Sequence, residues 1–176
     1  MRKFLRVLTP IVASAALALA VVSPAEAATS GGTGATFTLT GGALAITVPS
    51  GTADLGTYPA SVSTLQASGQ LGNVTVDDGR GSITPWTVTA ASTDFVSPNN
   101  TVPKAQVAYL AGTPTNTTGT VVVVPAASLN LTGVLPAVVG TPVGSNSATW
   151  NPTITVAFPL KAVAGTYNGT ITHSVS

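Results

Sequence analysis

The residues that could do chemistry are few in this 176-residue chain. His173 is the one histidine, cysteine is absent, and Asp77 and Asp78 are the only adjacent acidic pair. Histidine is the side chain best suited to exchange protons near neutral pH, but His173 has no cysteine to activate and no carboxylate near it in sequence. Neighbours on a strand point to opposite faces, so the two aspartates do not suit the paired carboxylates of a glycosidase. The alternative is a turn in which aspartate caps backbone amides before Gly79.

Two other kinds of site also lack their sequence signature. No Gly-x-Ser-x-Gly segment is present to position a serine nucleophile. The Asp-x-Asp-x-Asp-Gly spacing of a calcium loop is absent as well. We therefore expect a protein that is not an enzyme and that carries no cofactor and no metal.

The first 27 residues have the organisation of a secretory signal peptide. Basic residues begin the chain, an apolar stretch follows over 7–22, and small residues at Ala25 and Ala27 fit a signal peptidase. The apolar stretch contains polar residues and ends in this cleavage site, which favours export over a membrane anchor. We predict cleavage after Ala27, a flexible leader over 28–35 and one domain over 36–176.

The predicted mature chain is nearly uncharged, with three basic and four acidic residues. It offers no basic stripe for nucleic acid and no polybasic patch for anionic lipid. We therefore expect no nucleic-acid partner and, after removal of the signal, no membrane partner. Without cysteine the domain must fold by burial alone, which a chain of about 150 residues can do.

Composition and periodicity predict an all-β domain. The chain is rich in Thr and Val, whose β-branched side chains favour pleated surfaces. Short alternating apolar runs recur between turn signals, a pattern typical of a sandwich or a barrel. We predict a β-sandwich of short, mainly antiparallel strands with Greek-key-like connections. The expected strands lie at 37–39, 44–48, 71–76, 86–90, 102–110, 121–124, 129–131, 150–158 and 167–175.

The pattern makes four further local predictions. The strands at 71–76 and 86–90 form a hairpin with a long connection. The continuous valine run at 121–124 is a strand covered on both faces. Residues 133–146 mix Gly, Pro and Val without a period and form a long loop or crossover. Residues 60–68 form a short helix.

Two segments resemble a known family. The first is an Asp-rich Gly-Arg-Gly turn followed by Trp86-Thr87-Val88, and the second has the form Ala-Gly-Thr-Tyr-x-x-x-Ile-Thr-x-x-aliphatic over 164–175. Together they resemble the WxL domain family of Gram-positive cell-surface proteins, over roughly residues 36–176. In that family a Trp-x-Leu motif occurs twice, the second time in the C-terminal strand, and the domain attaches non-covalently to peptidoglycan.

The two family motifs match this sequence to different degrees. The first matches with Val88 in place of leucine, whereas His173-Ser174-Val175 stands where the family has its second Trp-x-Leu. One signature aromatic is therefore absent, although Tyr167 is present. The resemblance implies a secreted, cell-wall-associated protein whose partners are peptidoglycan or another wall glycan and other cell-surface proteins.

Seven residues are candidates for the motif or the wall contact. They are Trp86, Val88, Tyr109, Trp150, Tyr167, His173 and Val175. A tryptophan in such a strand either anchors the core or stacks an exposed indole on a sugar ring, and the sequence leaves both roles open.

Two other functions stay open. The first is a structural or assembly subunit whose exposed edge strand, such as 164–175, pairs with a partner's sheet. The other is a wall-acting hydrolase that uses Asp77 and Asp78, which we rank below both wall binding and the assembly subunit.

Overall fold

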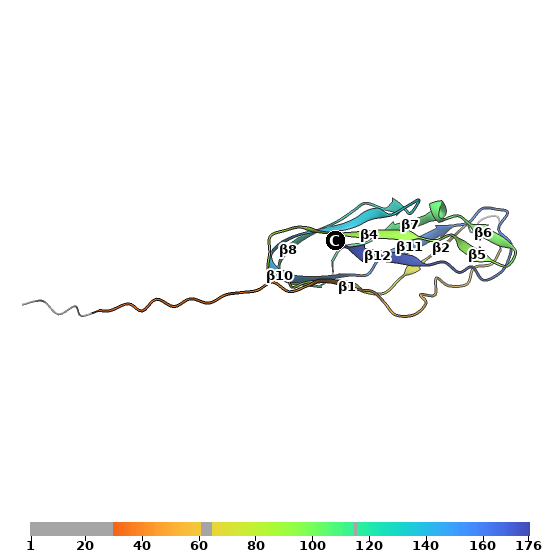
Figure 1. Cartoon of the computed structure of the whole chain (residues 1–176). Coiled ribbons are helices and arrows are strands. Elements are labelled where there is room, and N and C mark those ends of the chain that lie inside the picture. The colour runs from red at the N-terminus through yellow and green to blue at the C-terminus, as the bar shows by residue number, and fades with distance from the viewer. Residues whose placement is uncertain (1–29, 61–64, 115) are drawn as a thin grey trace, which may run out of the picture. The chain divides into compact units, whose positions relative to one another are not determined.

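The computed structural model describes residues 30–60, 65–114 and 116–176 (Figure 1). The predicted signal peptide lies outside the described residues. The chain divides into a first unit, Met1–Phe37, and a compact second unit, Thr38–Ser176. Within the first unit the described residues, 30–37, are exposed and form neither helix nor strand.

The predicted all-β, antiparallel class is confirmed. Every strand pairing among the described residues is antiparallel, and the one helix there is a single 3-10 turn. No described helix is long and apolar enough to cross a membrane. The elements are β1 (Leu44–Thr47), β2 (Gln66–Gln70), β3 (Val74–Asp78), β4 (Trp86–Ser92), β5 (Phe95–Ser97), β6 (Asn100–Val102), η1 (Lys104–Gln106), β7 (Val107–Leu110), β8 (Asn116–Pro125), β9 (Leu129–Asn130), β10 (Leu135–Trp150), β11 (Thr153–Ala157) and β12 (Ile171–Val175).

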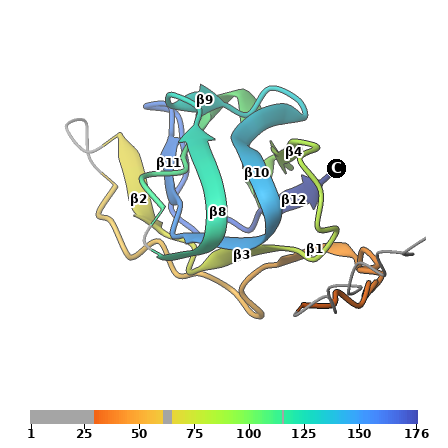
Figure 2. The same ribbon diagram turned by 90° about the vertical axis from the view of Figure 1, so that its left-hand side faces the viewer.

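A six-stranded sheet is organised around the 16-residue strand β10. One edge of β10 pairs with β8 along nearly its whole length, and the other edge pairs first with β4 and then with β3 (Figure 2). Strand β1 extends the sheet beyond β3, and β12 extends it beyond β4. Cα atoms of these two end strands approach within 8 Å, so the sheet is barrel-like and nearly closed. A four-stranded sheet, β2-β11-β7-β9, and the pair β5-β6 complete the fold.

Two bulges allow one edge of β10 to pair with both β4 and β3. The register shifts between Pro136 and Val138 and again between Val143 and Asn146. At the second shift Gly144 has a φ of +77°, a conformation that glycine adopts without steric cost. Bulges bend and twist a strand, which is how β10 turns from β4 to β3.

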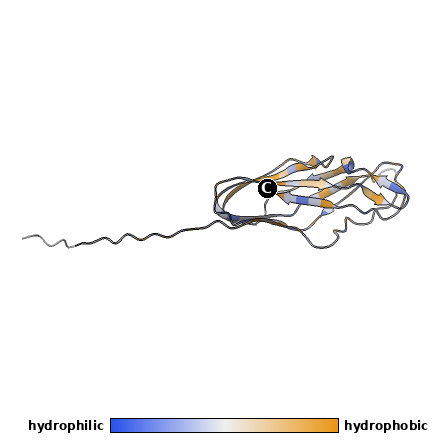
Figure 3. Ribbon diagram, viewed as in Figure 1, coloured by the Kyte–Doolittle hydropathy of each residue, from blue (hydrophilic) through white to orange (hydrophobic). Residues whose placement is uncertain are grey.

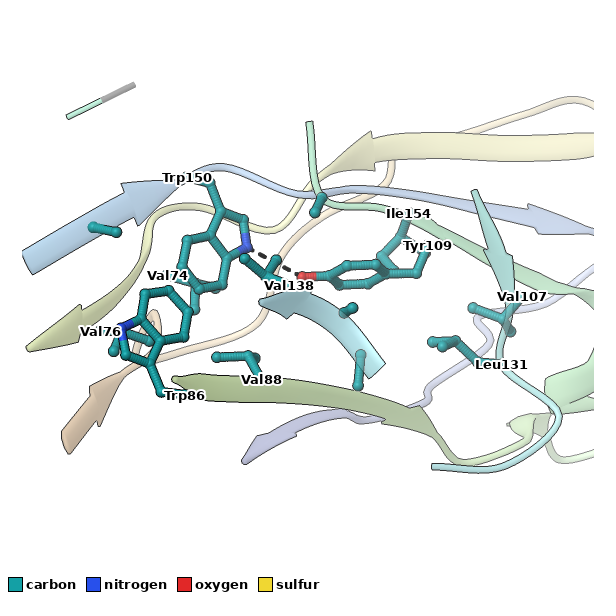
Figure 4. Packing of buried hydrophobic residues seen from close by; sticks show 14 of the residues in the cluster. Val74, Val76, Trp86, Val88, Val107, Tyr109, Leu131, Val138, Trp150 and Ile154 are labelled. Atoms are coloured by element: carbon teal, nitrogen blue, oxygen red, sulfur yellow. Dashed lines mark hydrogen bonds between the residues drawn. The ribbon is translucent and has the colours of Figure 1, made fainter. Parts of the chain in front are cut away.

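The core is one cluster of buried apolar side chains contributed by both larger sheets (Figure 4). Apolar residues, orange in Figure 3, are concentrated on these strands. The predicted strand at 86–90 is confirmed as part of β4, and its alternate residues Trp86, Val88 and Ala90 are all fully buried. Within 30–60, 65–114 and 116–176, the other buried apolar residues are Val74, Val76, Val102, Val107, Tyr109, Ala111, Leu131, Ala137, Val138, Ala148, Trp150, Ile154 and Val156.

The loop or crossover predicted at 133–146 is wrong, because strand β10 runs through most of it. Two of the glycines that suggest a loop have structural roles within the strand. Gly144 belongs to the second bulge, and Gly140 lies under the indole of Trp86, where a Cβ atom would overlap the ring.

Four other local predictions also fail. The expected hairpin between 71–76 and 86–90 is wrong, because β10 lies between β3 and β4. The valine run at 121–124 lies in β8, which is exposed on one face. Residues 37–39 form no strand. The predicted helix at 60–68 is wrong where β2 replaces it, and residues 61–64 lie outside the described residues.

Candidate functional site

The two motif segments are neighbouring strands. Strands β4 and β12 pair antiparallel, with Val175 opposite Val88 and His173 opposite Ala90. The pairing continues beyond β12, where the Thr87 amide donates to the Ser176 carbonyl at 2.8 Å. Strand β12 alternates half-buried and exposed residues, and both His173 and Val175 are half-buried.

A first buried polar network begins at Trp86. The indole Nε1 of Trp86 donates to Oδ1 of Asn146 at 3.4 Å, and Nδ2 of Asn146 donates to Oδ2 of Asp78 at 3.4 Å. Arg80 then holds both oxygens of Asp78, through Nε at 2.9 Å and Nη2 at 3.0 Å. We call Asp78, Arg80, Trp86 and Asn146 the charged network.

The charged network also closes the turn after β3. The Arg80 amide donates to Oδ1 of Asp78, and Nη2 of Arg80 donates to the Thr84 carbonyl. The predicted capping of a backbone amide is therefore confirmed for Asp78, which is 1% exposed. Hydrogen bonds from Arg80 hold the pKa of this carboxyl below its usual range. Asp77 is exposed, so the two aspartates point to opposite faces as expected.

A second buried polar network begins at the other tryptophan. The indole Nε1 of Trp150 donates to Oη of Tyr109 at 3.3 Å, as Figure 4 shows. The same hydroxyl lies 3.1 Å from Nε2 of His173, and the two rings are tilted by 60°. Burial lowers the pKa of His173 and raises that of Tyr109 to about 12, so both groups are neutral at pH 7. We call Tyr109, Trp150 and His173 the neutral network.

The neutral network ends at a cavity of about 1010 Å³, because His173 forms part of its wall. Residues of β2, β11 and β12 line it, together with the irregular segments 48–60 and 158–170. Tyr167 lies in the wall as well, and its hydroxyl donates to the Val163 carbonyl at 2.7 Å. Six apolar residues that line it are Leu71, Phe95, Ile154, Val156, Phe158 and Ile171.

The cavity wall is poor in charge. Its described lining contains one carboxylate, Asp54, and neither lysine nor arginine. A largely apolar cavity with a few polar groups is the usual form of a site for a small ligand or a peptide side chain. Across the described residues, no group of three or more His, Cys, Asp or Glu could hold a metal ion.

The structure gathers most of the predicted site residues. His173, Tyr109 and Trp150 are joined by hydrogen bonds, and Val88 pairs with Val175 on the adjacent strands. Tyr167 shares the cavity wall with His173, whereas Trp86 belongs to the charged network. Trp86, Trp150 and Tyr109 are at most 1% exposed, which supports the core interpretation of their rings.

Sequence reasoning missed Asn146, which joins Trp86 to Asp78. It lies within the segment predicted as a loop, and it is distant in sequence from both partners. Only the register of β10 against β3, which places Asn146 opposite Asp78, could have revealed it.

Comparisons with known proteins give no relative, because no family model, curated protein or solved structure matches the chain. The resemblance to the WxL family therefore stays a prediction.

Proposed function

We propose that this protein is exported, has no enzymatic activity and attaches non-covalently to the peptidoglycan of a Gram-positive cell wall. The observation that carries the proposal is the pairing of the two motif segments. Trp86–Val88 and His173–Val175, far apart in the chain, are adjacent strands in one sheet. This adjacency supports the resemblance to the WxL family, because the two segments that bear it belong to one structural unit.

The fold that we propose for this function is a β-sandwich with Greek-key-like connections. The support is that one core is shared by the six-stranded and the four-stranded sheet. Side chains from two facing sheets meet in this way in sandwiches.

The wall contact that we propose lies at the cavity beside β12. The tryptophans are buried, so stacking on sugar rings falls to exposed or half-buried aromatics such as Tyr58 and Tyr167 in the cavity wall. Thr166 and Asn168 add uncharged polar groups at the same wall. Neutral hydroxyls and amides suit the sugars of a glycan, and the apolar interior suits an alanine methyl or another apolar group of a stem peptide.

A pull-down with purified, protein-free peptidoglycan sacculi tests this function. We expect the secreted protein to pellet with sacculi and Tyr167→Ala to pellet several-fold less. A matched control is Thr132→Ala, at an exposed threonine that lies outside the cavity wall, which pellets like the wild type. Complete recovery of the wild type in the supernatant would overturn the proposed function. Equal pelleting of both variants and the wild type would remove the cavity as the contact.

A second candidate function, an assembly subunit, is favoured by a different observation. The edge predicted at 164–175 is a strand only over β12, and β1 approaches that strand. Strand β8 is a longer edge, with exposed valines. It is the better candidate for pairing with another protein.

A further inference from the structure

Strand β8 has one free edge. Its 10 residues, Asn116–Pro125, pair with β10, and among the described residues no other strand pairs with it. An edge strand presents a row of unpaired N–H and C=O groups, to which another strand can add. A free edge of this length is unusual, because natural edge strands tend to be short.

The outward face of β8 and β10 carries four exposed valines. Val122 is 64% exposed and Val124 58%, while Val139 and Val143 on β10 are 37% and 63% exposed. Val124 and Val139 are directly opposite each other in the register. The alternate residues Val121 and Val123 pack against the core, so the outward valines are a second apolar face.

Neither strand contains Asp, Glu, Lys or Arg. Natural edge strands are commonly protected by lysine, by inward-pointing charge or by proline, and β8 has only Pro125 at its end. This edge therefore lacks the devices that prevent pairing.

We propose that two copies of this protein associate through β8, antiparallel about a two-fold axis, to give a continuous β10–β8–β8–β10 sheet. The occupant is a second copy because β8 and β10 carry no charged side chain and both copies present the same exposed valines. Two identical neutral edges meet without like-charge repulsion, whereas a charged partner would find no opposite charge on β8 or β10. A two-fold contact also closes, so the proposed assembly ends at a dimer.

The outward valines reinforce this arrangement. Antiparallel pairing of two β8 strands brings the valine faces of both copies into one apolar strip. The backbone ladder supplies affinity and the strip adds burial, as in other cases of strand addition. This inference deepens the second candidate function and does not rest on wall attachment.

Sedimentation velocity of the secreted protein, from low micromolar to submillimolar concentration, tests the proposal. We expect a monomer–dimer equilibrium that Val122→Lys weakens by about tenfold or more, because the two-fold axis brings both lysines to one interface. Leu160→Lys is the matched control: it also replaces an exposed apolar residue, 70% exposed, and leaves dimerisation unchanged. Far-ultraviolet circular dichroism and emission from the buried tryptophans show that each variant is folded.

Three results would overturn the proposal. They are a monomer at every concentration, a dimer that a folded Val122→Lys variant retains, and an open polymer that Phe37→Lys abolishes. The last result would identify the exposed segment 37–39 of a second copy as the added strand. A monomer that pellets with sacculi refutes only the dimer, and a dimer that stays in the supernatant refutes only wall attachment.

Discussion

The charged and neutral networks each begin at a buried tryptophan, but they end differently. The charged network ends at Arg80. Its side chain is 25% exposed and donates hydrogen bonds to both carboxylate oxygens of Asp78. The neutral network ends at His173, in the wall of the cavity. One network is fixed by an ion pair, whereas the other is held by neutral groups beside an open volume.

Because of this difference, we expect the charged network to be a rigid part of the core and the neutral network to be an adaptable part. Charge-assisted hydrogen bonds are roughly twice as strong as neutral ones, so the charged network fixes the β3–β4 turn against β10. The neutral network has weaker bonds and adjoins space into which its last side chain can move. We therefore expect substitutions in the charged network to act on folding, and substitutions near the cavity to act on binding.

The largest expected effect is that of Asp78→Ala. It removes the acceptor of four hydrogen bonds, three from Arg80 and one from Asn146, and we expect the free energy of unfolding to fall by about 3 kcal/mol. Asp77→Ala is the matched control, because its side chain is exposed on the opposite face and should change stability by about 0.5 kcal/mol or less. Urea denaturation followed by tryptophan emission measures both. Equal losses in the two variants would contradict the distinction between the two aspartates.

Gly140→Ala tests how tightly the charged network is packed. A Cβ atom at Gly140 would overlap the Trp86 indole, so the ring or β10 must shift. We expect a loss of about 2 kcal/mol, in the range of overpacked cores. Gly133→Ala is the control, because a Cβ atom there meets nothing within 4 Å. Similar stabilities of the two variants would show that Trp86 has room to move.

Tyr109→Phe is the corresponding change in the neutral network. It removes the hydroxyl that accepts from Trp150 and contacts His173, and we expect a loss of about 1.5 kcal/mol. Tyr58→Phe removes an exposed hydroxyl that bonds Ser68, and we expect a smaller loss in the same urea titration. A loss for Tyr109→Phe as large as that for Asp78→Ala would break the contrast between the networks.

Some of this fold was predictable from alternation alone. Trp86, Val88 and Ala90 share a buried face, as do Ile154 and Val156, because a half-buried strand repeats every two residues. Period-two alternation indicates that a strand exists and which side is inward. It contains no information about which strand pairs with it.

The wrong predictions concern which strands are neighbours, and alternation does not give this information. In β10, Gly140 is required by contact with Trp86, so a residue typical of loops lies inside a long strand. The valines of β8 suggested burial on both faces, but burial depends on what covers the strand, and β8 lies at an edge. Asn146 and Asp78 meet only because β10 and β3 are in register. Long-range register decided each of these features.

The smallest expected effect is a pH dependence that belongs to the neutral network. Burial lowers the pKa of His173 in the folded state, so between that value and the unfolded value the unfolded chain binds more protons. The stabilisation is complete above about pH 6.5, the ordinary histidine value, and is lost as the pH falls below it. We expect the midpoint of urea unfolding to fall between pH 7 and pH 5.5 in the wild type.

His173→Gln should lack this fall, since glutamine is neutral throughout. The charged network does not interfere, because Arg80 holds the Asp78 carboxyl ionised until the pH is below the usual carboxyl range. Tyr109, with a pKa of about 12, stays protonated across the whole interval. Parallel pH profiles for the wild type and His173→Gln would mean that His173 is hydrated through the cavity, which would remove the burial on which this prediction depends.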